Sequence, residues 1–192
     1  MTAKLKHGIT KVKDPGSALT HFIAMILAII AAMPLLSKAG HDSGHMHISA
    51  LAIFILSMIG LYAASTIYHT LDISPKINKL LRKIDHMMIF ILIAGTYTPV
   101  CMIVLGDKTG WTMLTLVWGI AIVGILINAL WITCPKWFSS LIYIAMGWVC
   151  ILAITKILSS MPRAGFMWLL AGGIIYTVGG IIYAMKLPFF NS

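Results

Sequence analysis

The sequence has little charge and very little acid. Only 10% of its 192 residues are charged, with five Asp and Glu against 14 Lys and Arg, whereas 60% are hydrophobic. This composition excludes an ordinary soluble domain and indicates a polytopic membrane protein. The net charge of +9 would favour nucleic acid in a soluble protein. Here the basic residues lie between hydrophobic runs, where they set membrane orientation, so we expect no nucleic-acid partner.

Cysteine is also scarce. Cys101, Cys134 and Cys150 are scattered through apolar stretches without the spacing of a metal site or a disulfide framework. We interpret them as small buried apolar residues, which leaves the redox compartment open. The first apolar run is too long for a signal peptide and lacks a convincing cleavage site, so we expect it in the mature protein.

Six hydrophobic runs are long enough to cross a bilayer, which takes about 20 residues. They cover about residues 17–36, 48–68, 84–105, 111–132, 138–158 and 165–185. We predict an all-α polytopic membrane helix bundle with six transmembrane helices. Its domains are a basic tail over 1–16, one bundle over 17–188 and a short tail over 189–192. The stretch 76–84 is predicted to be an amphipathic segment at the interface.

Positive charge predicts the orientation of the bundle. With the N-terminus inside, the internal segments hold Lys4, Lys6, Lys11, Lys13, Lys76, Lys79, Arg82, Lys83, Lys136 and Lys186. The external segments hold only Lys38, Lys108 and Arg163. Because Lys and Arg are enriched in cytoplasmic loops, we predict that both termini are cytoplasmic. Lys156, near the outer end of the fifth run, is expected to snorkel.

Polar residues gather where three predicted helix ends meet at the cytoplasmic face. His21 begins the first span, Ser65 and His69 end the second, and Asp85 begins the third. Ser65 and His69 are four residues apart and therefore share a helix face. Ionisable groups at the edge of a membrane bundle normally face its interior or a cavity, so this cluster is our functional hypothesis.

Each of these residues also has a structural interpretation. His69 could cap its span, and Ser65 could bond to the preceding helical turn. Asp85 could be a helix N-cap or a partner of Arg82. His86 is adjacent to Asp85 and points about 100° away around the helix, which disfavours joint ligation of a metal.

Two other patterns indicate less about function. His41, His45 and His47 resemble a metal-binding tract, but the segment 37–47 is predicted to be a solvated external loop, in which these histidines are dispensable. The run Gly172-Gly-Ile-Ile-Tyr176 recurs as Gly179-Gly-Ile-Ile-Tyr183. Its small residues predict a face for close helix packing.

The motifs taken together resemble those of bacterial hemolysin III proteins, in the superfamily of the progestin and adipoQ receptors and the alkaline ceramidases. The matching stretches are Thr20-His21, Ser65-Thr-Ile-Tyr-His69-Thr70, Asp85-His86, Ile93-Ala-Gly-Thr-Tyr-Thr-Pro99, Gly173-Ile-Ile-Tyr-Thr-Val-Gly179 and Tyr183-Ala184. The resemblance covers about residues 14 to 188, and its linked second-helix and third-helix motifs are specific. It implies a protein of the bacterial inner membrane.

The resemblance implies a seven-helix bundle with zinc near the cytoplasmic face, held by one histidine on helix two and two on helix seven. His69 matches the first ligand, Asp85 the carboxylate at the metal-bound water, and Ser65 the hydroxyl near that water. Such a zinc ion can hydrolyse an amide such as a ceramide. The resemblance thus predicts catalytic Asp85 and Ser65, a zinc ligand in His69, and a sphingolipid-like or fatty-amide ligand from the membrane.

The C-terminal end departs from the family pattern. The family has His-x-x-x-His on helix seven, whereas only Phe189-Phe-Asn-Ser192 follows Pro188. We expect an incomplete zinc site that would need His21, His86 or another chain to close. The alternative function is the cytolytic activity for which hemolysin III is named. The spans lack an obvious stripe of charges for a single-chain aqueous pore, so a pore would require a homo-oligomer.

Overall fold

The computed structural model describes residues 12–42, 44–131 and 136–185, and these residues form helices joined by short connections. The elements are α1 (Pro15–Asp42), α2 (His45–Thr70), α3 (Pro75–Pro99), the π-helical η1 (Val100–Leu105), α4 (Lys108–Leu130), α5 (Lys136–Gly147), the 3₁₀-helical η2 (Trp148–Ala153), α6 (Ile154–Ser160) and α7 (Arg163–Met185). Within the described ranges, six helical stretches are long and apolar enough to cross a membrane. The predicted all-α membrane bundle is confirmed.

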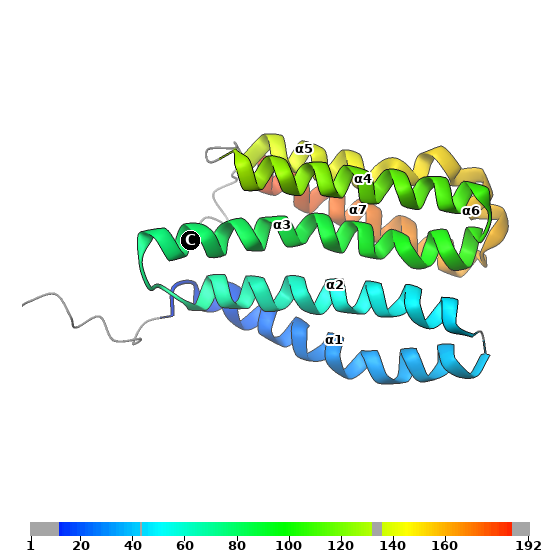
Figure 1. The fold of residues 1–192 in the computed structure, drawn as a ribbon, viewed down its shortest axis with the longest axis horizontal. Helices are drawn as coiled ribbons and strands as arrows, with labels where there is room; N and C mark the ends of the chain where they lie inside the picture. Colours follow the sequence, from blue (N-terminus) through cyan, green and yellow to red (C-terminus); the bar gives the residue numbers. More distant parts are fainter. Residues whose placement is uncertain (1–11, 43, 132–135, 186–192) are drawn as a thin grey trace, which may run out of the picture.

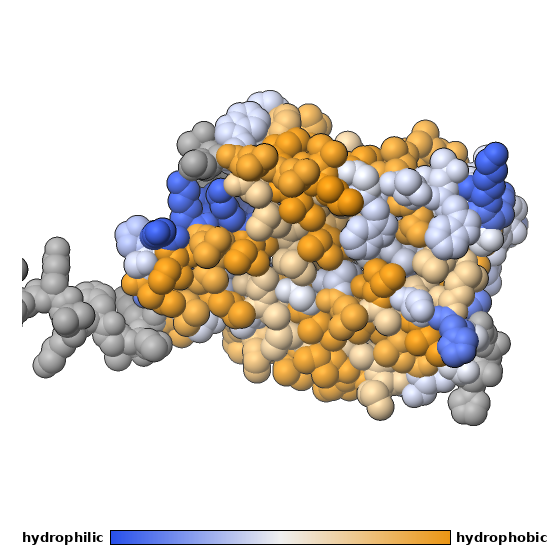
Figure 2. All heavy atoms as spheres, in the orientation of Figure 1, coloured by the Kyte–Doolittle hydropathy of each residue, from blue (hydrophilic) through white to orange (hydrophobic). Residues whose placement is uncertain are grey.

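The spans run side by side in a bundle (Figure 1), with α1 against α2, α2 against α3, α3 against α4, and α5 against α7. α3 is the most enclosed span and includes the fully buried Phe90 and Ala94. Hydrophobic residues cover much of the visible face, and hydrophilic residues gather near its two ends (Figure 2). This distribution suits helices surrounded by lipid, where the ends meet water.

The connection between α1 and α2 is shorter than the sequence suggested. α1 continues to Asp42 and α2 begins at His45, so the expected solvated loop over 37–47 is wrong. His45 and His47 lie instead in the first turn of α2. His47 Nδ1 is buried and has no hydrogen-bond partner in the part of the chain that the structure describes. The side chain of His41 lies outside that part.

α3 begins well before the predicted third span. Its N-cap is Ser74, whose hydroxyl accepts a hydrogen bond from the Ile77 amide at 3.3 Å, and Pro75 occupies the first turn. Proline suits that position because its missing N–H would have no helical partner there. The predicted interfacial segment 76–84 is therefore continuous with the span. Asp85 lies nearly three turns inside the helix, so its interpretation as an N-cap is wrong.

The fifth span changes helix type along its length. α5 ends at Gly147, and a 3₁₀ stretch separates it from α6. Such a change disturbs backbone hydrogen bonding, which lipid cannot replace. The Tyr97 hydroxyl donates to the Gly147 carbonyl at 2.7 Å and accepts from the Cys150 amide at 2.9 Å. A side chain of α3 thus bonds the last residue of α5 and a residue within the irregular segment.

The cysteines are only partly as expected. Cys101 is buried, Cys150 is half-buried, and both are free thiols. Cys134 lies outside the described residues. The sulfur of Cys150 contacts the Gly147 carbonyl at 3.6 Å, so this cysteine belongs to the irregular part of the fifth span.

An ion pair joins the fifth span to the start of α4. The Lys156 ammonium contacts the Asp107 carboxylate and donates to the Thr109 hydroxyl at 3.1 Å. Asp107 is also the N-cap of α4 and accepts from the amides of Thr109 and Gly110. The hydrogen bond from Lys156 holds the pKa of the Asp107 carboxyl below its ordinary value. Lys156, expected to snorkel, therefore has a protein partner.

α7 packs less closely than its glycine repeat predicted. A Cβ atom added at Gly172, Gly173 or Gly179 would meet no atom within 4 Å, whereas one at Gly180 would lie 3.0 Å from the Ile144 side chain. Close packing along the whole repeat is therefore wrong for the described residues. The apolar window of α7 has no buried residue.

Gly124 on α4 provides a test of the contact with α3. An added Cβ would lie 2.4 Å from the ring of Phe90, which is fully buried and has little room to move. We expect Gly124→Ala to lower the free energy of unfolding by about 1–2 kcal/mol, measured by reversible denaturation in micelles. Gly119→Ala on the same helix is the control, because its Cβ would meet nothing within 4 Å. Equal stability of the two variants would contradict tight packing at Gly124.

Candidate functional site

The structure brings the predicted polar residues of the first three spans together. The Ser65 hydroxyl lies 2.9 Å from His21 Nδ1, and the rings of His21 and His69 are 5.6 Å apart between centroids. Asp85 is 9% exposed and lies close enough to Ser65 and His69 to interact with both electrostatically. We call His21, Ser65, His69, Asp85 and His86 the membrane-face cluster. It lies where α1 begins, at the left of Figure 1.

Ser65 lies between a histidine and a carboxylate. Between Ser65 and His21, the tautomer of the ring decides which group donates: the hydroxyl donates to a bare Nδ1, and a protonated Nδ1 donates to the hydroxyl oxygen. In a serine hydrolase the histidine lies between the serine and the acid, where it removes the hydroxyl proton. Here Ser65 contacts His21, and none of the hydrogen bonds found among the described residues joins the His21 ring to a carboxylate, so the arrangement differs from that triad.

His86 joins the cluster at its edge. Its Nδ1 lies 2.7 Å from the Arg82 carbonyl and 3.5 Å from the Asp85 carboxylate. Its own carbonyl accepts a hydrogen bond from the Tyr143 hydroxyl at 2.9 Å. The ring therefore bonds mainly to the preceding turn of α3, and its contact with Asp85 is the longer one.

Sequence reasoning missed Asp14, which it placed in the basic tail. Asp14 Oδ2 lies 2.9 Å from His69 Nδ1, and the Asp14 amide donates to the His69 carbonyl at 2.9 Å. The Asp14-Pro15 pair is the pattern of an N-cap followed by the first helical residue. That pattern marks the start of α1 but does not show that the carboxylate bonds to another helix.

Known proteins match this chain over nearly its whole length, including the residues of the membrane-face cluster. The family described as haemolysin-III related matches residues 9–189. The chain belongs to this family. Hemolysin-3 of Bacillus cereus is 39% identical over 191 residues, which is 98% of this chain and 87% of the relative. The Hemolysin-3 homolog of Bacillus subtilis (strain 168) is 37% identical over 181 residues, which is 94% of this chain and 84% of the relative.

The match confirms the resemblance based on the sequence motifs, and the six apolar helices make this haemolysin-III protein an integral membrane protein. The bacterial inner membrane and the cytoplasmic location of both termini stay predictions. The catalytic roles of Ser65 and Asp85, and the ligand roles of His21, His69 and His86, also stay predictions.

The described residues of this haemolysin-III chain do not form a metal site by themselves. Within 12–42, 44–131 and 136–185, no three His, Cys, Asp or Glu side chains are placed to hold a metal ion. A catalytic zinc site normally takes three protein ligands. Zinc therefore does not fit these residues alone, and a complete ligand set needs donors from outside them.

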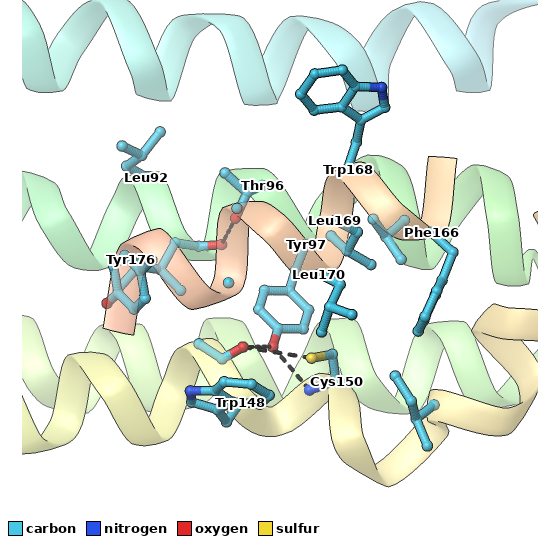
Figure 3. Close-up of a pocket in the computed structure, with 16 residues that line it drawn as sticks. Leu92, Thr96, Tyr97, Trp148, Cys150, Phe166, Trp168, Leu169, Leu170 and Tyr176 are labelled. Atoms are coloured by element: carbon cyan, nitrogen blue, oxygen red, sulfur yellow. Dashed lines mark hydrogen bonds between the residues drawn. The ribbon is translucent and has the colours of Figure 1, made fainter. Parts of the chain in front are cut away.

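An apolar cavity lies along α3 beyond the cluster of this haemolysin-III protein (Figure 3). Its volume is about 350 Å³, within the usual range for small-molecule pockets. Residues of α3, α7 and the fifth span line it, including Leu92, Thr96, Trp148, Phe166, Leu169 and Tyr176. The Tyr176 hydroxyl is buried without a hydrogen-bond partner among the described residues.

Leu92 and Thr96 relate this cavity to the cluster. They follow Asp85 by seven and eleven residues, spacings that place all three on one face of α3. At 1.5 Å per residue, Leu92 lies about 10 Å and Thr96 about 16 Å further along the helix than Asp85. No sequence motif indicated this cavity, because its walls come from three separate spans.

Proposed function

We propose that the protein binds a membrane lipid at the membrane-face cluster and the apolar cavity, as a lipid-amide hydrolase or a related receptor. The observation that carries this proposal is the shared face of α3. Asp85 lies at its polar end, and Leu92 and Thr96 line the cavity further along the helix. A sphingolipid-like or fatty-amide molecule has the same division between a polar group and an apolar chain.

In this proposal Asp85 accepts a proton from the water that attacks the amide carbonyl and delivers it to the amine that leaves when the C–N bond breaks. General acid–base groups of this kind contribute about 10²–10⁴-fold to a reaction rate. Ser65 and His21, which contact each other at 2.9 Å, lie beside the carboxylate and provide polar surroundings for it. Zinc enters the proposal only with donors from outside the described residues, from this chain or from a second copy in a homo-oligomer. No step above depends on it.

The charges near the cluster support a cytoplasmic location for it. Lys13, Lys76, Lys79, Arg82 and Lys83 belong to the helix ends and connections on that side of the bundle. Because positively charged residues favour the cytoplasmic side, we propose that the cluster faces the cytoplasm of a bacterial inner membrane.

A ceramide with a photoreactive group in its acyl chain tests the proposal. In lipid nanodiscs we expect labelling to concentrate on residues 92–100 and 166–176. Thr96→Trp should remove most of this label because the indole fills the cavity. Leu116→Trp, at an exposed position of α4, is the matched control and should keep it. Uniform labelling of exposed helices that is unchanged in Thr96→Trp would contradict the proposed site.

The alternative is a cytolytic pore made by several copies, as the relatives' name hemolysin suggests. The absence of buried residues in the apolar window of α7 favours this alternative, because that helix has surface available for another copy. The same purified protein distinguishes the two functions in dye-loaded liposomes. A pore releases dye with a steep dependence on protein concentration, whereas a lipid-binding site gives labelling without leakage.

A further inference from the structure

We propose that Asp14 is a positioning residue that fixes the tautomer and orientation of His69. His69 is the last residue but one of α2, where a side chain has little helical structure after it. Its Nδ1 lies 2.9 Å from the Asp14 carboxylate, and the two side chains are only 20% and 23% exposed. A carboxylate cannot donate, so Nδ1 carries the hydrogen of a neutral His69 and Nε2 carries the lone pair.

Backbone contacts hold Asp14 in place. The Asp14 amide donates to the His69 carbonyl at 2.9 Å, and the Lys13 amide donates to the Thr70 carbonyl at 3.4 Å. The last carbonyls of a helix lack partners within the helix, so these bonds also complete the end of α2. The Lys13 ammonium lies 3.6 Å from the centroid of the Tyr68 ring. We call residues 13–14 the N-terminal strap.

The N-terminal strap links the two helices whose histidines face each other. Pro15 begins α1 directly after Asp14, and His21 lies less than two turns further along that helix. The strap therefore holds the end of α2 beside the start of α1, where the rings of His21 and His69 are 5.6 Å apart. Donation from a histidine Nδ1 to a carboxylate is a common way to direct Nε2 toward a ligand or a metal.

The purely structural interpretation is that Asp14 and His69 form an ordinary ion pair at a helix end. That interpretation predicts a loss of stability when Asp14 is replaced, but it requires no particular tautomer of a neutral ring. The proposed role requires the Nδ1–H tautomer and its loss when the carboxylate is removed. The tautomer of His69 does not depend on the proposed function. Only the purpose of the free Nε2 lone pair, which would face a ligand, rests on it.

Long-range ¹H–¹⁵N correlation spectra of the full chain, with ¹⁵N-labelled histidine, test this inference. At about pH 8.5, where ordinary histidines are neutral, the His69 signals should show a protonated Nδ1 and an unprotonated Nε2. His69→Gln identifies these signals. Asp14→Leu should shift the His69 signals toward the Nε2–H tautomer, and Asp14→Glu should retain the Nδ1–H tautomer at least in part. Asp72→Leu is the control. Asp72 lies in the connection between α2 and α3 and bonds to Asn78 of α3, outside the membrane-face cluster.

An Nε2–H tautomer of His69 in the wild-type protein would overturn the inference. An unchanged Nδ1–H tautomer in Asp14→Leu would overturn it as well, and Asp14→Ala provides a second variant without an acceptor if the leucine variant does not fold. Ceramide labelling of the same samples separates this result from the proposed function. Labelling as expected with an unchanged tautomer in Asp14→Leu rejects the role of Asp14 alone. A tautomer shift in Asp14→Leu without ceramide labelling of the wild type rejects the lipid site alone.

Discussion

Replacing Asp85 by asparagine is expected to lower lipid-amide hydrolysis by about 10²–10⁴-fold, the usual contribution of a general acid–base group. Asparagine has nearly the same size and keeps a carbonyl oxygen that can accept a hydrogen bond, so the buried site should stay packed. It cannot exchange a proton in the way that a carboxylate does. Release of fatty acid from a fluorescent ceramide in mixed micelles measures the rate.

Asp72→Asn is the matched control for this experiment. Asp72 is exposed and bonds to Asn78 outside the cluster, so its replacement should leave the rate unchanged. Equal rates in Asp85→Asn and the wild type would show that Asp85 has only a structural role. Parallel losses in both variants would indicate that the assay reports general stability rather than the site.

Replacing Tyr97 by phenylalanine is expected to destabilise the bundle by about 2–4 kcal/mol. The substitution keeps the ring in the core and removes the hydroxyl that bonds the Gly147 carbonyl and the Cys150 amide. A buried backbone group that loses its partner costs about 1–3 kcal/mol, and lipid supplies no substitute, although the Gly147 carbonyl keeps its weak contact with the Cys150 sulfur. The free energy of unfolding in micelles measures the loss.

Tyr68→Phe is the control for the tyrosine substitution. The Tyr68 ring lies beside the Lys13 ammonium, and phenylalanine can keep that contact. We therefore expect a smaller effect than that of Tyr97→Phe. A loss at Tyr97 no greater than that at Tyr68 would show that the fifth span does not depend on the Tyr97 hydroxyl.

The fold class and the six spans could be predicted because they depend on the length and hydropathy of local segments. Hydropathy does not locate helix ends in polar sequence, where capping decides them. Ser74 and Pro75 therefore start α3 before its apolar run, and α1 continues to Asp42. The irregular segment 148–153 contains neither Gly nor Pro, and the Tyr97 contact that accompanies it comes from another span.

The candidate site was predictable to the extent that helix ends bring residues together. His21, Ser65, His69 and Asp85 were expected at one face, and the structure places them there. The burial of Asp85 and the contact between Ser65 and His21 depend on tertiary packing that spacing does not show. Asp14 was missed for the same reason, since its partner His69 is 55 residues away in the sequence.

The 3₁₀ stretch in the fifth span also sets the direction in which the side chains of α6 point around the helix axis. Six residues turn through about 720° at three residues per turn, compared with about 600° in an α-helix. η2 therefore rotates α6 by about 120° relative to a continuous helix and advances it by about 3 Å along the axis. Lys156 faces Asp107 in this rotated setting. If the segment became α-helical, Lys156 would turn away from the start of α4. The ion pair therefore forms only when residues 148–153 are in the 3₁₀ conformation.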